Sequence, residues 1–177
     1  MPPVSESGEA QLNGVDLGAV SAITERYRRD PAAGRRPFGA RVRWLGAYRT
    51  ESRLGEDTLV RGDEPLELAG DGTGPSPEDM LLGAVGQCLI VGLAGGASAR
   101  GIRIDELAVD VRGKVNLTAA FGLAGDASPG FESIDIDVRL RSDAPRADLE
   151  ALIERALALA PIPNSLQRPV PVHARLA

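Results

Sequence analysis

Cysteine supplies the strongest nucleophile among the ordinary side chains, and this chain holds one, Cys88. On a helical wheel Cys88 shares its face with apolar and small residues only, which allows another helix or strand to come close. These residues are Leu81, Ala84, Val85, Val91, Gly92 and Gly95. Two interpretations stay open: a thiol that is packed in the core, or a thiolate that a nearby cation activates.

Charged residues that could accompany such a thiolate precede it in the chain. Four arginines fall in a predicted strand region, where a solvated strand face is the alternative for most of them: Arg41, Arg43, Arg49 and Arg53. Glu78 lies ten residues before Cys88, about 15 Å away along a straight helix. Glu78 therefore either complements the positive end of the helix dipole or reaches a thiol site through a bend or a second subunit.

The remaining candidates predict no metal and no cofactor. His173 is the sole histidine and no second cysteine accompanies it, which disfavours a metal site or a catalytic dyad. The run Gly70-Asp71-Gly72-Thr73-Gly74 resembles a phosphate loop but lacks the Lys-Ser/Thr that follows one, so a turn is expected. Asp135 and Asp137 face one side of a predicted strand, as a solvated face would have them.

Composition narrows the class of protein. The 177 residues are 43% hydrophobic and 25% charged, which is typical of one globular domain with a core. The net charge of -5 and the aromatic content of 3% disfavour nucleic acid as a partner. A single cysteine and the lack of a signal segment favour a cytoplasmic protein.

The longest predicted element is an uncharged stretch over residues 80–99. Its length suits a membrane span or a helix that is buried on all sides. Gln87, the glycines and the absence of an aromatic belt favour the buried helix. Ser76 is the expected N-cap with Pro77 in the first turn, and Arg100-Gly101 is the expected end.

The other elements follow from hydrophobic periodicity. Residues 1–14 are expected to fray, and an amphipathic helix is expected from Asp16 to Asp30. Alternation predicts a three-stranded antiparallel meander, two further antiparallel strands and a last strand, and a second amphipathic helix follows an Asp143-Ala144-Pro145 cap. The strands are expected over 38–44, 48–54, 57–61, 102–117, 131–140 and 170–176. The domain boundaries predicted are a tail and short helix over 1–37 and one domain over 38–177.

Two segments carry a resemblance to a known family. Residues 74–82, GPSPEDMLL, followed by Cys88 in an Ala/Gly-rich helix, resemble the OsmC/Ohr motif G-x-N-P-E-x-L-L with its cysteine ten residues after the glutamate. Residues 160–166, APIPNSL, resemble the second family motif, C-P-V-S-N-x-L. The resemblance covers roughly residues 38–176. It implies an α+β fold in which antiparallel sheets wrap around a long buried central helix, as an intertwined homodimer.

The resemblance also implies an activity and its residues. Family members reduce organic hydroperoxides with a peroxidatic cysteine, which is assisted by an arginine and a glutamate. By this resemblance Cys88 is the peroxidatic thiol and Glu78 the carboxylate. The arginine follows the first strand and its glycine turn, which points to Arg49, with Arg53 as second choice.

The chain departs from the family at two positions. Ser76 stands where the motif usually has asparagine, and Ala160 stands where typical members carry the resolving cysteine. The disulfide that would recycle Cys88 within the chain cannot form, so an external thiol or dithiol is the expected reductant. The function expected is a one-cysteine organic hydroperoxide reductase. The alternative is a non-catalytic binding protein for a small hydrophobic ligand at the dimer interface.

Overall fold

The computed structural model describes residues 11–176 of the chain. Contacts divide the chain into two compact units. One unit comprises Val85–Ala177 with the chain up to Pro31, and the other comprises Ala32–Ala84. The helix α2, Pro77–Ala99, begins in the second unit and continues into the first.

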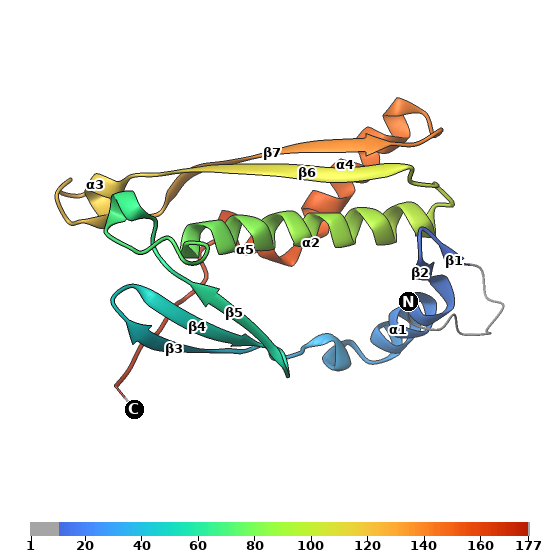
Figure 1. Ribbon diagram of the computed structural model, residues 1–177. Coiled ribbons are helices and arrows are strands. Elements are labelled where there is room, and N and C mark those ends of the chain that lie inside the picture. Colours follow the sequence, from blue (N-terminus) through green and yellow to red (C-terminus); the bar gives the residue numbers. More distant parts are fainter. Residues whose placement is uncertain (1–10, 177) are drawn as a thin grey trace. The chain divides into compact units, whose positions relative to one another are not determined.

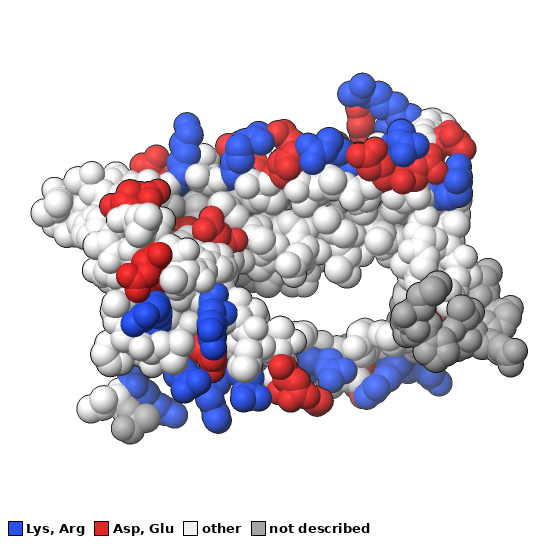
Figure 2. Space-filling view, viewed as in Figure 1, with Lys and Arg blue, Asp and Glu red and all other residues white. Residues whose placement is uncertain are grey.

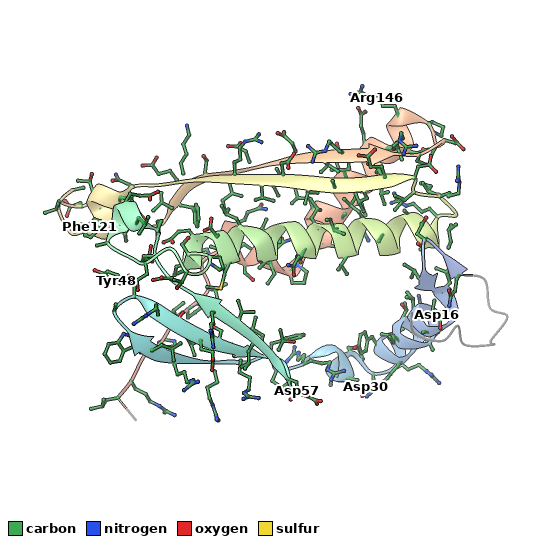
Figure 3. All side chains as sticks on the ribbon, viewed as in Figure 1. Asp16, Asp30, Tyr48, Asp57, Phe121 and Arg146 are labelled. Atoms are coloured by element: carbon green, nitrogen blue, oxygen red, sulfur yellow. The ribbon has the colours of Figure 1, made fainter. Side chains whose placement is uncertain are left out.

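A three-stranded antiparallel meander forms most of the 32–84 unit (Figure 1). Its strands are β3 (Ala40–Gly46), β4 (Arg49–Leu54) and β5 (Thr58–Gly62), in the order β3-β4-β5. The short 3-10 helices Pro31–Gly34 and Leu66–Leu68 flank the sheet in sequence. Tyr48 and Asp57 mark the two turns between the strands (Figure 3). These strands confirm the meander that alternation predicts.

The loop that follows β5 is built around one buried carboxylate, Asp63, which is 2% exposed. Asp63 accepts hydrogen bonds from the backbone amides of Glu64, Asp71 and Thr73, and from the Thr73 hydroxyl at 2.8 Å. These bonds lower the pKa of Asp63, the amide of Thr73 most of all. Gly70 is required where the loop returns, because an added Cβ would lie 1.8 Å from the carbonyl oxygen of Glu64.

Helix α2 begins with a reciprocal cap, as the sequence predicts. The Asp79 amide donates to Ser76 Oγ at 3.1 Å, and the Ser76 amide donates to Asp79 Oδ2 at 3.1 Å. The helix then runs without interruption for 23 residues. It ends before Gly101, which has a positive φ of 71°.

The core of the larger unit lies where α2 meets a long hairpin and a second helix (Figure 1). The hairpin pairs β6 (Glu106–Val115) with β7 (Phe131–Arg141), and the helix is α4 (Arg146–Leu159), whose first residue Figure 3 labels. A one-turn helix, α3 (Leu117–Ala120), opens the connection between the two strands. Small residues on α2 let these elements approach closely. A Cβ added at Gly86 would lie 3.1 Å from the Val109 side chain, and a Cβ added at Gly92 would lie 3.6 Å from the Ala156 side chain.

Among residues 11–176, one side of α2 is packed into the core and the other side is exposed, so the expectation of a helix buried on all sides is wrong for the described single chain. Val85, Leu89, Leu93 and Ala97 are buried, whereas Val91 is 73% exposed. The buried residues recur every four positions and so form one stripe, which the hairpin and α4 cover. By length and composition α2 could span a membrane, and its buried stripe is part of the core of the larger unit.

The chain before α2 holds two further features. The short strands β1 (Gln11–Leu12) and β2 (Val15–Asp16) form a hairpin, and Asp16 caps helix α1 (Leu17–Arg29) through the Ala19 amide. Residues 11–14 therefore do not fray, since Asn13 in this hairpin hydrogen-bonds Ser98 near the end of α2. The rest of the expected fraying segment lies outside the described residues.

The carboxyl end departs from the expectation as well. Helix α4 ends at Leu159, and the chain then forms another helix, α5 (Pro161–Gln167), which the sequence does not predict. Residues 169–176 follow without a strand ladder inside the described chain, so the predicted last strand is wrong for the single chain. Alternation predicts apolar contacts there, yet Val172 is 89% exposed.

Candidate active site

The thiol of Cys88 lies at the edge of the buried stripe of α2. Cys88 is half-buried and forms no disulfide, between the exposed Gln87 and the buried Leu89. The helical face assigned to it from the sequence is divided, because Val85 belongs to the core and Val91 faces solvent. A side chain in this position is packed on one side and partly accessible on the other.

Ala160 occupies a buried place in the same unit, at the junction between α4 and α5. The side chain of Asn164 closes this junction, since its amide nitrogen lies 3.2 Å from the carbonyls of Leu157 and Ala158 and 2.8 Å from that of Ala160. The asparagine of the second motif thus satisfies carbonyls that a helix end leaves without partners. Asn164 keeps this structural role although position 160, where typical family members carry the resolving cysteine, is alanine.

Arg49 is the first residue of β4, directly after the turn from β3. Its Nη1 lies 3.6 Å from Asp71 Oδ2, and its Nε donates to the Gly46 carbonyl at 3.5 Å. The Arg49 side chain is 47% exposed. It lines a cavity of about 420 Å³ with residues from all three strands and the following loop: Leu45, Thr50, Arg61, Gly62 and Thr73. The guanidinium of Arg49 makes this cavity suited to a polar or anionic group.

Asp71 owes its position to Asp63. The Asp71 amide donates to the Asp63 carboxylate at 3.2 Å, which fixes the backbone from which the Asp71 side chain reaches Arg49. Neither residue follows from the sequence as a site residue. The glycines of the 70–74 segment indicate a tight turn, but nothing in the sequence indicates that a carboxylate at position 63 fills that turn.

Glu78 stands in the first turn of α2, within a group of acidic side chains. Burial raises the pKa of Glu64, and repulsion from Glu78, Asp63 and Asp79 raises it further. Because Glu78 also lies at the positive end of the helix, the dipole offsets part of this repulsion. Among residues 11–176, no three metal-binding side chains gather into a metal site, this acidic group included.

Arg53, the second choice for the site arginine, is exposed on β4. Its Nη1 lies 3.5 Å from the Glu56 carbonyl, and cross-strand pairing places Arg53 opposite Arg41. Arg49 thus differs from Arg53 in having a carboxylate partner, Asp71.

The structure places two of the three expected site residues in one compact unit and the third in the other. Arg49 and Glu78 belong to the 32–84 unit, and Cys88 belongs to the other. Within the described chain the carboxylate at ion-pair distance from Arg49 is Asp71. Glu78 and Cys88 share one unbroken helix, which sets them about 15 Å apart along its axis.

Comparison with known proteins supports the two sequence motifs. A family model described as OsmC-like protein matches residues 70–175, more than half of the chain. The uncharacterized protein YmaD of Bacillus subtilis is 39% identical over 82 residues, which are 46% of this chain and 55% of that protein. The chain thus spans about half the length of that relative.

Solved structures show the same fold. An OsmC-like protein from Mycoplasma pneumoniae is similar with a TM-score of 0.65 and 18% identity, over 75% of this chain and 88% of that one. An organic hydroperoxide resistance protein from Elizabethkingia anophelis has a TM-score of 0.56 and 15% identity, over 75% and 89% of the two chains. Together with the matched family model, these similarities show that the chain belongs to the OsmC-like family.

Proposed function

We propose that this protein is a thiol-dependent peroxidase that reduces organic hydroperoxides through Cys88. The observation that carries the proposal is the place of Cys88, a free, half-buried thiol at the margin of a packed helix in an OsmC-like chain. A solved relative of the same fold is called an organic hydroperoxide resistance protein. The proposal gives this chain the reaction that such a name describes.

The reaction follows from thiolate chemistry. The Cys88 thiolate attacks the distal oxygen of the hydroperoxide, so an S–O bond forms while the O–O bond breaks. Sulfur loses two electrons and becomes a sulfenic acid, and the peroxide becomes an alcohol once its alkoxide takes a proton. In this proposal Arg49 stabilises the thiolate and the departing alkoxide. In the same proposal Glu78 holds the guanidinium in place together with Asp71, whose Oδ2 lies 3.6 Å from Arg49 Nη1.

Recycling needs a second molecule, because the chain has one cysteine and Ala160 stands at the position of the resolving one. An external thiol attacks the sulfenic acid, which forms a mixed disulfide and releases water. A second thiol then displaces Cys88 as a thiol. A dithiol reductant supplies both steps in one molecule.

We also propose that the working form is an intertwined homodimer in the cytoplasm. The exposed side of α2 and the alternating 169–176 segment leave apolar side chains uncovered in the single chain, among them Val91 and Val172. A second copy would cover them, since isolated apolar surface of this kind favours association. It also offers a way for Glu78 to serve a thiol that lies far along its own helix.

A peroxidase assay with matched variants tests the proposal. Wild-type protein with dithiothreitol should consume cumene hydroperoxide, and Cys88→Ser should lose that activity. Arg49→Ala should lower the rate at least tenfold, whereas Arg53→Ala, on the same strand, should leave it nearly unchanged. A dimedone-type probe should trap the sulfenic acid on Cys88 after one equivalent of peroxide. Equal peroxide consumption by wild type and Cys88→Ser would overturn the proposal.

The loss of the resolving cysteine favours a second candidate, a non-catalytic OsmC-like protein that binds a small hydrophobic ligand. The two functions differ in how readily Cys88 reacts. For a peroxidase, alkylation of the native protein should accelerate with a midpoint well below pH 8.5, roughly the ordinary value for a free thiol. A thiol that stays unreactive until higher pH would support the binding protein.

A further inference from the structure

One face of the β3-β4-β5 sheet carries an excess of arginine. Strand register places Arg41 opposite Arg53, and Arg43 opposite Glu51, which lies opposite Arg61 in turn. Directly opposed residues point to the same side of a sheet. Four guanidinium groups therefore share this face with one carboxylate, and Figure 2 shows positive side chains gathered over these strands. We call Arg41, Arg43, Arg53 and Arg61 the arginine face.

The one carboxylate on this face is already paired. Arg43 Nη2 lies 2.8 Å from Glu51 Oε1, and Arg61 Nε lies 4.0 Å from Glu51 Oε2. Within residues 11–176 no carboxylate lies at ion-pair distance from Arg41 or Arg53. Like charges directly opposite each other across a sheet are unfavourable, so this pair needs an anion more than any other on the sheet.

A hollow of about 230 Å³ lies among these side chains. Its lining consists of Arg41, Arg43, Glu51, Arg53 and Leu59. Sites for larger organic ligands measure roughly 300 to 1,000 Å³, so this hollow fits a smaller group. Three guanidinium groups against one carboxylate leave an excess of two positive charges. A doubly charged oxyanion balances that excess, whereas a single carboxylate would leave one charge over.

The segment whose sequence resembles a phosphate loop does not compete for this anion. In residues 70–74 the amides of Asp71 and Thr73 donate to the buried carboxylate of Asp63. That loop therefore holds an anion of its own chain. On the sheet, Arg41 and Arg53 have no carboxylate partner within residues 11–176.

We propose that this hollow binds a phosphate group, either inorganic phosphate or the phosphoryl group of a small monoester or lipid headgroup. Arg41 and Arg53 donate to the phosphoryl oxygens from opposite strands, since planar guanidinium groups suit bidentate binding of phosphate. Arg43 adds charge while it stays paired with Glu51. The site uses neither Cys88 nor Arg49 and is independent of the peroxidase proposal.

Calorimetric titration of the full chain at low ionic strength tests this site. Inorganic phosphate and phenyl phosphate are the soluble probes, and vesicles containing phosphatidic acid, compared with phosphatidylcholine alone, are the membrane probe. Wild type should bind saturably, and Arg41→Gln and Arg53→Gln should each lose about tenfold in affinity. Arg112→Gln is the matched control, because Arg112 is an exposed strand arginine that already pairs with Asp137. It should bind like wild type.

A thermal melt separates binding from a purely structural role. Without phosphate, Arg41→Gln should unfold at the same temperature as wild type or higher, because the like-charge opposition is gone. Added phosphate should then raise the melting temperature of wild type more than that of Arg41→Gln. Saturable binding confined to the soluble esters, or confined to the vesicles, identifies the source of the phosphate group. No saturable binding of any probe, or an equal loss in Arg112→Gln, would overturn the site.

Discussion

The two units of this protein keep different kinds of side chain away from water. The buried apolar residues among residues 11–176 lie in the larger unit, on α2, α4 and α5 and at Ala160 between the last two helices. In the 32–84 unit the buried polar side chains are Ser52 and Asp63. The contrast teaches that the larger unit is stabilised by packing, which responds little to pH. The 32–84 unit depends on charges and hydrogen bonds, which respond strongly.

The charged surfaces of the two sheets differ in the same way. On the β6–β7 hairpin Arg112 pairs with Asp137 and Arg139 pairs with Asp110. Figure 2 shows the two signs interleaved along that hairpin. On the arginine face, Arg41 and Arg53 have no carboxylate partner in the part of the chain that the structure describes. The surface of the β6–β7 hairpin is electrically balanced, whereas the arginine face carries excess positive charge.

The largest expected effect is a loss of folding stability in the core of the larger unit. Leu93 of α2 is fully buried in the core that α2 forms with α4. Leu93→Ala should lower the free energy of unfolding by about 2 to 5 kcal/mol. The loss should be equal at pH 5 and pH 8, because no titrating group takes part. Urea unfolding followed by circular dichroism measures it. Val91→Ala, on the exposed side of the same helix, should change the free energy by about 0.5 kcal/mol or less.

The next largest expected effect is a loss of folding stability in the 32–84 unit, caused by a clash with its backbone. Gly70→Ala places a Cβ where the Glu64 carbonyl oxygen lies, so the loop must move, at a cost of about 1 to 3 kcal/mol. The matched control is Gly83→Ala, because Gly83 lies on α2 with open space around its Cα. Alanine there should stabilise the protein by about 0.5 to 1 kcal/mol. Stability equal to wild type in Gly70→Ala would show that the loop yields easily.

A smaller effect sharpens the contrast in pH dependence. The pKa of Asp63 is lowered in the folded protein, so its ionised form adds stability above the pKa of the unfolded chain. That stability is lost as pH falls through the folded pKa. Asp63→Asn should therefore be less stable than wild type at pH 7, and the two proteins should converge as the pH falls through the acid range. A difference that is constant from pH 7 to pH 3 would contradict this account.

The smallest effect has the opposite sign. The pKa of Glu64 is raised, chiefly by burial, so its ionised form opposes folding at pH 7. Glu64→Gln should be slightly more stable than wild type at pH 7. The gain should shrink as the pH falls through the raised pKa, because wild type then takes up the proton. Melting temperatures at pH 7 and pH 4 test this, with Glu67→Gln, exposed in the same loop, as control.

Local rules in the sequence predict most of the fold. Alternation places β3 to β7, and the Ser76 and Asp16 caps mark the starts of α2 and α1, because each of these signals acts within a few residues. The last strand could not be predicted in the same way. The alternation over residues 170–176 favours a strand, but the pattern does not identify the partner strand with which these residues would form hydrogen bonds.

The candidate site shows the same division. Cys88, Glu78 and the arginine region follow from residue type and motif spacing. The pairing of Arg49 with Asp71 depends on a loop that closes on a carboxylate eight residues earlier, and no local signal marks it. Asn13 is a similar case, since its partners Ser98 and Ile104 lie more than 80 residues away.

Asn13 has a consequence for the uniqueness of the fold. The buried apolar stripe of α2 repeats every four residues, so a helix displaced by one repeat, about 6 Å, would again present apolar side chains to its neighbours. Asn13 binds Ser98 Oγ at 3.0 Å, the Ile102 carbonyl at 2.9 Å and the Ile104 amide at 2.8 Å, and a displaced helix would leave these groups unsatisfied. The hydrogen bonds of Asn13 thus fix the position of helix α2 along its axis, as buried polar groups fix the register of coiled coils. Without them we expect several coexisting settings, visible as duplicated amide signals in NMR spectra, rather than one uniformly weakened structure.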